Sequence, residues 1–108
     1  MWQVTLDPAT GAEIKKTRPA VVVSSDGVGR LPVKLVALLT AWQAHFALDI
    51  WHVRIEPDRL NGLTKTSAVD VLQIRGVDTS RMISRLGCVS ETVMTEITAA
   101  IAAVIERV

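Results

Sequence analysis

Thr-Arg-Pro-Ala-Val-Val-Val-Ser-Ser, residues 17–25, is the segment of this 108-residue chain that says most about its structure. Valine is branched at Cβ and favours strands, and Pro19 fixes its own φ, so we expect a strand over residues 18–25. Arg18 stands immediately ahead of the apolar run, which would hold its cation at the mouth of a rigid sheet. A permanently charged, planar guanidinium in that place is suited to binding phosphate.

Other segments of the chain also have the pattern of β-strands. Residues 50–56 alternate strictly, with Trp51, Val53 and Ile55 on one face and polar side chains on the other, as in a half-buried antiparallel strand. The remaining expected strands are residues 2–6, residues 33–40 and the second half of residues 67–75, the last with a break at Gly76.

Two helices are expected near the C-terminal end. Ser90 is a good N-cap, and apolar residues follow it at three- and four-residue spacing, which predicts one long amphipathic helix over residues 90–108. Residues 78–86 have the pattern of a shorter helix that would be capped at its start and ended by Gly87.

The expected elements predict an α+β, mostly β fold. A chain of this length has room for one core, so we expect a single domain over residues 1–108. Five or so short strands protect their edges best by curling, which favours a strongly bent antiparallel sheet or partial barrel closed by the C-terminal helix.

Composition and charge say more about the cell compartment that we expect for the protein than about its activity. Twelve Lys and Arg against eleven Asp and Glu give a net charge of +1, which by itself does not indicate a nucleic-acid partner. The apolar runs are shorter than the roughly twenty residues that a membrane-spanning helix needs. The first residues lack the features of a secretion signal, and the single Cys88 cannot form an internal disulfide. A reducing cytoplasm is therefore the default expectation.

Local motifs for cofactor or metal chemistry are not found in the sequence. It has no Gly-rich phosphate loop and no Cys or His pair with metal-ligand spacing. We expect His52 to lie on the open face of its strand rather than act as an acid or base. Because tryptophan buries a large apolar area, Trp42 and Trp51 are expected to anchor the core or an interface, with base stacking as the less favoured alternative.

Several segments share an order and spacing that run through nearly the whole chain. They are Trp2 to Asp7-Pro8, Gly11-x-Glu13-Ile14-x-Lys16-x-Arg18-Pro19 with the valines and serines that follow, Thr40, Asn61-Gly62-Leu63, Ser67, Gln73-Ile74-Arg75-Gly76-Val77-Asp78, Arg81 and Gly87. Together they resemble the MazF/PemK toxins of bacterial toxin-antitoxin modules. The start departs from the family, which usually has a Gly and an acidic residue just before the first strand, where Met1 precedes Trp2 here.

The resemblance implies a small SH3-like, CcdB-like barrel, a homodimer, and ribosome-independent cleavage of single-stranded RNA at short sequence motifs. It also implies a cognate antitoxin whose acidic, disordered tail lies across the active groove. In this family the 2′-hydroxyl of the RNA attacks the adjacent phosphate and leaves a 2′,3′-cyclic phosphate and a 5′-hydroxyl. The resemblance therefore implies that no metal or cofactor is needed.

The resemblance also assigns roles to individual residues. Arg18, Thr40 and Glu13 are expected to be catalytic: Arg18 would stabilise negative charge on the phosphate, Thr40 would hold a phosphate oxygen or organise the leaving group, and Glu13 would orient Arg18 or act as base. Ser67 is expected to supply a supporting hydrogen bond beside the groove. Lys15, Lys16 and Arg30, the last within the loop of residues 26–32, are expected to contact RNA.

One position departs from the family pattern and leaves the mechanism open. Some relatives carry an acid directly before the Gln of the Gln-x-Arg segment, and here that position is Leu72, which cannot accept a proton. Asp70 points to the same face by strand alternation, but it is a weak candidate to replace the acid. Leu72 leaves open a degenerate member that only binds antitoxin. A separate alternative is a gyrase-binding poison of the same fold, like CcdB, which would use its dimer surface and the last helix residues instead of a groove.

Overall fold

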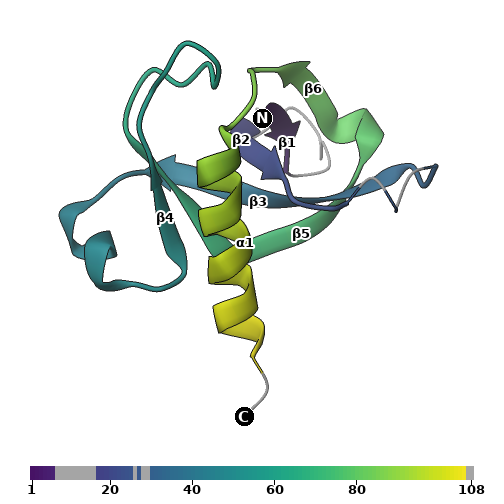
Figure 1. The fold of residues 1–108 in the computed structure, drawn as a ribbon. Helices are drawn as coiled ribbons and strands as arrows, with labels where there is room; N and C mark the ends of the chain where they lie inside the picture. Colours follow the sequence, from purple (N-terminus) through teal and green to yellow (C-terminus); the bar gives the residue numbers. More distant parts are fainter. Residues whose placement is uncertain (7–16, 26, 28–29, 107–108) are drawn as a thin grey trace.

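The computed structural model describes residues 1–6, 17–25, 27 and 30–106, and within them six strands form one antiparallel sheet (Figure 1). The elements in chain order are β1 (Trp2–Thr5), β2 (Thr17–Val22), β3 (Val33–Ala41), the 3-10 helix η2 (Ala44–Leu48), β4 (His52–Ile55), β5 (Ser67–Asp78), the 3-10 helix η3 (Thr79–Arg81), β6 (Met82–Arg85) and α1 (Glu91–Ile105). The strands lie in the order β4-β5-β3-β2-β1-β6. The expected fold class, mostly β with a long C-terminal helix, is confirmed.

The pairing of β3 with β5 gives the sheet its bend. Ala37 lies opposite Ile74, but the next residue, Leu38, lies opposite Asp70, so residues 71–73 of β5 have no partner in β3. Extra residues on one strand bend it and increase its twist. This lets β5, a strand of 12 residues, run along both halves of a curled sheet. The expected break at Gly76 is wrong, because the irregularity lies at residues 71–73 and β5 continues through Gly76.

Helix α1 covers one face of the sheet: it packs against β4 and β5, and in Figure 1 it crosses in front of β3 and β5 with β4 beside it. Ser90 caps it as predicted, with its Oγ accepting a hydrogen bond from the Val93 amide at 3.2 Å. Ile97 and Ala100 are the buried residues of the helix, and they belong to the same apolar cluster as Val53 and Val69 of the sheet. Burial of this apolar face is the main favourable term that holds the helix in place.

The other face of the sheet has a core of its own. Side chains alternate along a strand, so Ala37 and Leu39 of β3 belong to the cluster under α1 while Val36 and Leu38 belong to a second cluster. The further buried members of the second cluster are Val4, Ala20 and Val77. Strand β3 is thus buried on both faces, and the curl of the sheet covers the face that has no helix.

The segment after β5 differs from the sequence-based expectation. Asp78 does act as a cap, with its carboxylate accepting a hydrogen bond from the Ser80 amide at 2.8 Å, but the turn it caps ends at Arg81. Residues 82–85 then form strand β6, which pairs with β1. The helix expected over residues 78–86 is therefore wrong. The exposed backbone edge of β1 offers this segment a hydrogen-bonding partner that a local reading of the pattern did not take into account.

A turn at Asn61-Gly62 and the chain before α1 meet at a tightly packed site, which we call the Asn61 corner (residues 56–63 and 86–88). Asn61 is 1% exposed; its Oδ1 accepts from the amides of Asp58 and Leu63, and its Nδ2 donates to the Glu56 carbonyl at 2.8 Å. Gly62 has a φ of 70°, and a Cβ placed on it would collide with the Leu86 carbonyl. The predicted turn is confirmed, and it requires glycine at its second position.

Candidate functional site

Arg18 is positioned at the start of β2 by its own backbone pairing and by a carbonyl of β3. In the β1–β2 ladder it lies opposite Val4. Its Nη2 donates a hydrogen bond to the carbonyl oxygen of Leu39 at 2.8 Å. This contact uses one edge of the half-buried guanidinium and leaves its other N–H groups able to bind an anion.

The neighbouring proline explains why that carbonyl is free. The Val23 amide donates to the Leu35 carbonyl at 2.9 Å, and hydrogen-bonded pairs in an antiparallel ladder recur every second residue. Continuing the register of β2 and β3 places Pro19 opposite Leu39 in such a pair. Proline has no N–H to donate, so the Leu39 carbonyl accepts from the Arg18 side chain instead. In the Arg-Pro sequence, the proline leaves the Leu39 carbonyl without a backbone donor, and the arginine supplies a side-chain donor in its place.

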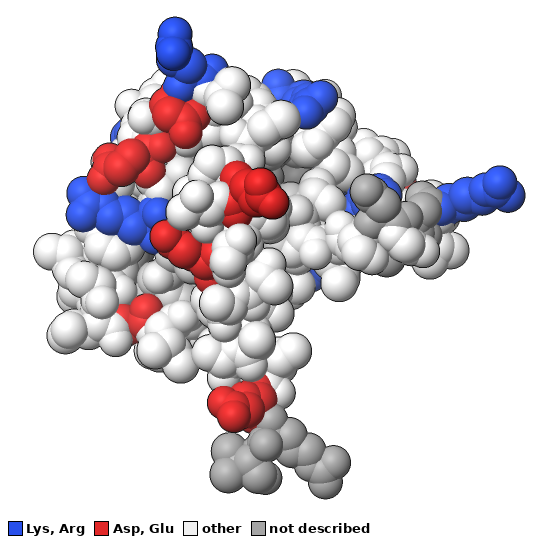
Figure 2. Space-filling model, viewed as in Figure 1, with Lys and Arg blue, Asp and Glu red and all other residues white. Residues whose placement is uncertain are grey.

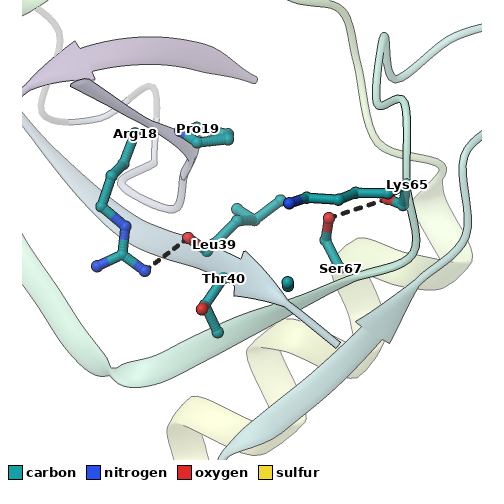
Figure 3. Close-up of a pocket in the computed structure, with 7 residues that line it drawn as sticks. Arg18, Pro19, Leu39, Thr40, Lys65 and Ser67 are labelled. Atoms are coloured by element: carbon teal, nitrogen blue, oxygen red, sulfur yellow. Dashed lines mark hydrogen bonds between the residues drawn. The ribbon is translucent and has the colours of Figure 1, made fainter. Parts of the chain in front are cut away.

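Thr40 is brought to the same place by the same register. Ala20 lies opposite Leu38, so two residues further along the ladder Arg18 faces Thr40, and their side chains lie on one side of the hairpin. Figure 3 shows the guanidinium and the threonine hydroxyl on the same side of the Leu39 carbonyl. The structure thus brings together two of the residues singled out from the sequence.

These residues line a pocket with a volume of about 310 Å³. Its lining residues are Arg18, Pro19, Leu39, Thr40, Ala41, Lys65 and Ser67. Lys65 and Ser67 lie across Leu39 from Arg18 and Thr40 (Figure 3), and the Ser67 hydroxyl donates to the Lys65 carbonyl at 3.0 Å. Ser67 therefore supports the loop that presents Lys65. Lys65 itself was not predicted, because a lone lysine beside a turn carries no sequence signal.

The pocket is a local concentration of positive charge. Its lining contains the cations Arg18 and Lys65 and no carboxylate among the residues that the structure describes. By contrast, Figure 2 shows acidic and basic side chains interspersed on the face that carries α1. The net charge of +1 thus conceals a site that would attract an anion at short range.

The remaining predicted residues are not brought into this pocket. Arg30 is exposed in the loop between β2 and β3, at the opposite end of these strands from Arg18 and Thr40. Glu13, Lys15 and Lys16 lie outside the described residues. Their roles stay predictions.

Neither Leu72, at the position where some relatives carry an acid, nor the nearby Asp70 lines the pocket. Leu72 is exposed, in the part of β5 that has no partner in β3. Asp70 does not line the pocket: its Oδ1 accepts from the Leu72 amide at 3.0 Å, and its Oδ2 lies 3.7 Å from His52 Nε2. Asp70 is therefore engaged in holding the bend of β5.

His52 is not on an open face, contrary to the sequence-based expectation. Its side chain is 7% exposed and stacks on the Phe46 ring at a centroid distance of 3.8 Å. Its Nδ1 lies 2.9 Å from the Asp49 carboxylate. Helix η2 folds Phe46 over this strand, a tertiary contact that strict alternation within residues 50–56 does not reveal.

The described part of the chain has neither a metal-binding cluster nor a membrane-spanning helix. Over residues 1–6, 17–25, 27 and 30–106, no group of three or more His, Cys, Asp or Glu side chains is placed to hold a metal ion. No helix in the same residues is long and apolar enough to cross a membrane. The pocket around Arg18 and Thr40 is the candidate site.

Comparisons with known proteins agree on one family. A family model described as PemK-like, MazF-like toxin of type II toxin-antitoxin system matches residues 1–105. The chain is also 32% identical over 93 residues to endoribonuclease MazF9 of Mycobacterium tuberculosis, a match that covers 83% of this chain and 79% of that protein.

Solved structures share the fold. The Mycobacterium tuberculosis toxin MazF-mt6 superposes with a TM-score of 0.74 at 18% identity, covering 94% of this chain and 91% of that one. A MazE-MazF structure from Deinococcus radiodurans gives 0.74 at 21% identity, covering 95% and 88%. A mycobacterial endoribonuclease in complex with its cognate antitoxin gives 0.72 at 19% identity, covering 94% and 86%. At these identities the likeness establishes the fold, and it confirms the fold that the sequence resemblance implied.

Proposed function

Since the chain belongs to the PemK-like, MazF-like toxins of type II toxin-antitoxin systems, we propose that it is a ribosome-independent endoribonuclease that cleaves single-stranded RNA at short sequence motifs. The observation that carries this proposal is the shared pocket of Arg18 and Thr40, with the guanidinium fixed by the Leu39 carbonyl. An always-charged fork beside a hydroxyl suits a phosphate whose negative charge grows in the transition state.

The proposed reaction needs no external nucleophile. The 2′-oxygen of the RNA forms a bond to the adjacent phosphorus, and the bond from phosphorus to the 5′-oxygen of the next nucleotide breaks. The proton of the 2′-hydroxyl passes to a base, and the departing 5′-oxygen takes up a proton. The products are a 2′,3′-cyclic phosphate and a 5′-hydroxyl, and the reaction requires neither a metal nor a cofactor.

Each residue of the pocket has a proposed part in these steps. Arg18 stabilises the charge on the non-bridging phosphate oxygens, and because its orientation is preset by Leu39 it pays little reorganisation cost in the transition state. Thr40 holds a phosphate oxygen or the departing oxygen through its hydroxyl. Lys65 adds a second positive charge to the phosphate site. Glu13 is our candidate for the proton acceptor.

The surroundings of the site complete the proposal. Lys15, Lys16 and Arg30 contact the RNA on either side of the cleaved bond. A cognate antitoxin with an acidic, disordered tail covers the groove, as suggested by similar structures that are complexes with antitoxins. The toxin acts in the cytoplasm as a homodimer, formed from the single domain of residues 1–108.

The test is incubation of the purified protein with a mixed-sequence RNA in EDTA, followed by analysis of the product ends. Fragments with cyclic phosphate and 5′-hydroxyl ends are expected, and Arg18→Ala should not produce them. Intact RNA combined with trapping of gyrase on DNA would instead support a gyrase poison. Intact RNA with antitoxin binding alone would support a degenerate member.

A further inference from the structure

A second cation lies on the same face of the sheet as Arg18 and Thr40. Thr40 of β3 is opposite Ala68 of β5, and Ala68 is opposite Arg54 of β4. Directly opposite residues in a sheet point to one face, so Thr40, Ala68 and Arg54 form a row across three strands. Arg18 continues the row on the other side of Thr40. The face that carries the proposed phosphate site therefore extends to Arg54.

A tryptophan lies beside this row. The Trp42 amide donates to the Thr66 carbonyl at 3.1 Å, which continues the β3–β5 ladder beyond Ala41. Trp42 is thus two residues from Thr40 on the same face, about 7 Å along the strand. Arg54 Cζ lies over the Trp42 ring at 5.3 Å from its centroid, and the Arg54 side chain is 55% exposed. The guanidinium is therefore backed by an aromatic ring and open to solvent.

We propose that Arg54, backed by Trp42, is a stacking platform for a base of the RNA whose cleaved phosphate lies at Arg18 and Thr40. The proposal rests on the proposed function and adds a base-binding subsite to it. Unpaired bases are recognised by stacking on aromatic rings and on arginine planes, which single-stranded RNA allows and a duplex does not. The cation–π contact keeps the guanidinium plane oriented before the base arrives.

The platform is held from below by a chain of aromatic contacts. Trp42 meets the Phe46 ring edge to face at 5.8 Å, Phe46 stacks on His52, and His52 is fixed by the Asp49 carboxylate. Ordered supports of this kind reduce the entropy that is lost when a ligand binds.

The ion pair of Arg54 with Glu56 leaves the face of the guanidinium open. The ion pair of Arg54 with Glu56, at 2.7 Å, joins two side chains that are both more than half exposed, and such pairs contribute little. It contacts the edge of the guanidinium through Nη2 and leaves the plane for stacking. Trp51, in the turn just before β4, packs against the cluster under α1 and serves as the internal control.

The test measures binding of an oligonucleotide that cannot be cleaved, made by placing a 2′-deoxynucleotide at a cut site mapped with a test RNA. Abasic residues replace its bases one at a time, and binding is compared for the unmodified protein, Arg54→Ala, Arg54→Lys, Trp42→Phe and the control Trp51→Phe. Melting temperatures confirm that each variant is folded.

One abasic position is expected to weaken binding by the unmodified protein. Arg54→Ala should weaken binding of the intact oligonucleotide roughly 5- to 150-fold. It should bind the oligonucleotide that is abasic at that position almost as well as the unmodified protein does. Arg54→Lys should behave like Arg54→Ala because it keeps the charge but not the plane. Trp42→Phe, which retains an aromatic backing, should keep most of the affinity, as should Trp51→Phe.

The outcomes separate this proposal from the one on which it rests. If Arg54→Lys binds normally, or if Arg54→Ala weakens intact and abasic oligonucleotides equally, Arg54 contacts phosphate and the platform is rejected while the endoribonuclease proposal stands. If the unmodified protein neither cleaves nor binds RNA, both proposals fail.

Discussion

The Arg18–Thr40 pocket and the Asn61 corner are both built from polar groups beside a turn or strand end, but they use these groups in opposite ways. At the corner, both polar atoms of the buried Asn61 side chain have backbone partners, and two backbone segments touch at Gly62. In the pocket, Arg18 makes one hydrogen bond, to the Leu39 carbonyl, and Thr40 lines the same cavity. Polar groups whose partners are all within the protein, at a closed site, indicate a structural role. Polar groups with unused hydrogen-bonding capacity at an open site indicate binding or catalysis.

Arg18→Ala should separate the two regions most sharply. Loss of the positive charge that the Leu39 contact orients toward the reacting phosphate is expected to lower kcat by roughly 10²–10³-fold or more, as for other transition-state charge contacts. Because Arg18 is half-buried and makes one backbone hydrogen bond, the melting temperature should change little. Cleavage assays and thermal melts of one preparation check both statements. Full activity in the folded variant would remove Arg18 from the mechanism.

Gly62→Ala should show the reverse pattern. A Cβ at a φ of 70° is strained and would collide with the Leu86 carbonyl, so the free energy of unfolding should fall by about 2 kcal/mol or more. Urea denaturation measures this loss. Cleavage per folded molecule, assayed well below the melting temperature, should stay near normal. A stable Gly62→Ala protein would show that the corner can relax.

Thr40→Val tests the hydroxyl without changing the shape of the strand. Valine keeps the branched Cβ, so the fold should be retained, while the loss of one hydrogen bond to the phosphate should lower kcat about tenfold. Thr40→Ser, which restores the hydroxyl on a smaller side chain, should recover most of the rate. Equal rates for the Val and Ser variants would assign Thr40 to packing alone.

Pro19→Ala tests whether the proline is what leaves the Leu39 carbonyl free to orient the Arg18 guanidinium. Alanine supplies an N–H that competes with Arg18 for the Leu39 carbonyl, at a gain of roughly 1 kcal/mol for the new bond. Arg18 would then lose its anchor, and kcat should fall about fivefold with no loss of stability. An unchanged rate would mean that the Leu39 contact is not needed to orient the guanidinium.

The smallest expected effect concerns neither region and serves as a baseline. The hydrogen bonds from Ser80 lower the pKa of Asp78 below its usual value. A carboxylate whose pKa is lower in the folded state stabilises the protein above its unfolded pKa, and this contribution disappears as the pH falls through the folded pKa. Asp78→Asn keeps the capping oxygen but cannot titrate, so its stability relative to the unmodified protein should depend on pH only in the acidic range. Unfolding curves from pH 2 to 7 test this; a difference that does not vary with pH would contradict it.

Much of the fold follows from local patterns in the sequence. Alternation and Pro19 predict strands over residues 2–6, 18–25 and 50–56, which correspond to β1, β2 and β4, and the cap at Ser90 predicts the last helix. Strand β6 was missed because its stability comes from pairing with β1, which is distant in the sequence. The same holds for the extra residues 71–73, which are a property of two strands together.

For the candidate site, the sequence identifies three of the side chains that line the pocket but not the contacts that hold them in place. Arg18, Thr40 and Ser67 were singled out through the family resemblance, and all three line one pocket. Lys65, the Leu39 carbonyl and the burial of His52 could not be predicted, because each depends on a contact between separate strands or loops. Neither spacing nor composition encodes a backbone carbonyl that becomes free when proline faces it.

The partner of Arg18 is a main-chain oxygen, which no substitution can delete. Residue 39 can therefore drift among apolar side chains that fill the core without touching the orientation of the guanidinium. A change of the side chain at position 39 can therefore alter core packing without removing the hydrogen bond that orients Arg18. If the proposed function holds, the stability of the core can change through residue 39 while the orientation of the guanidinium continues to depend on the dipeptide at positions 18 and 19.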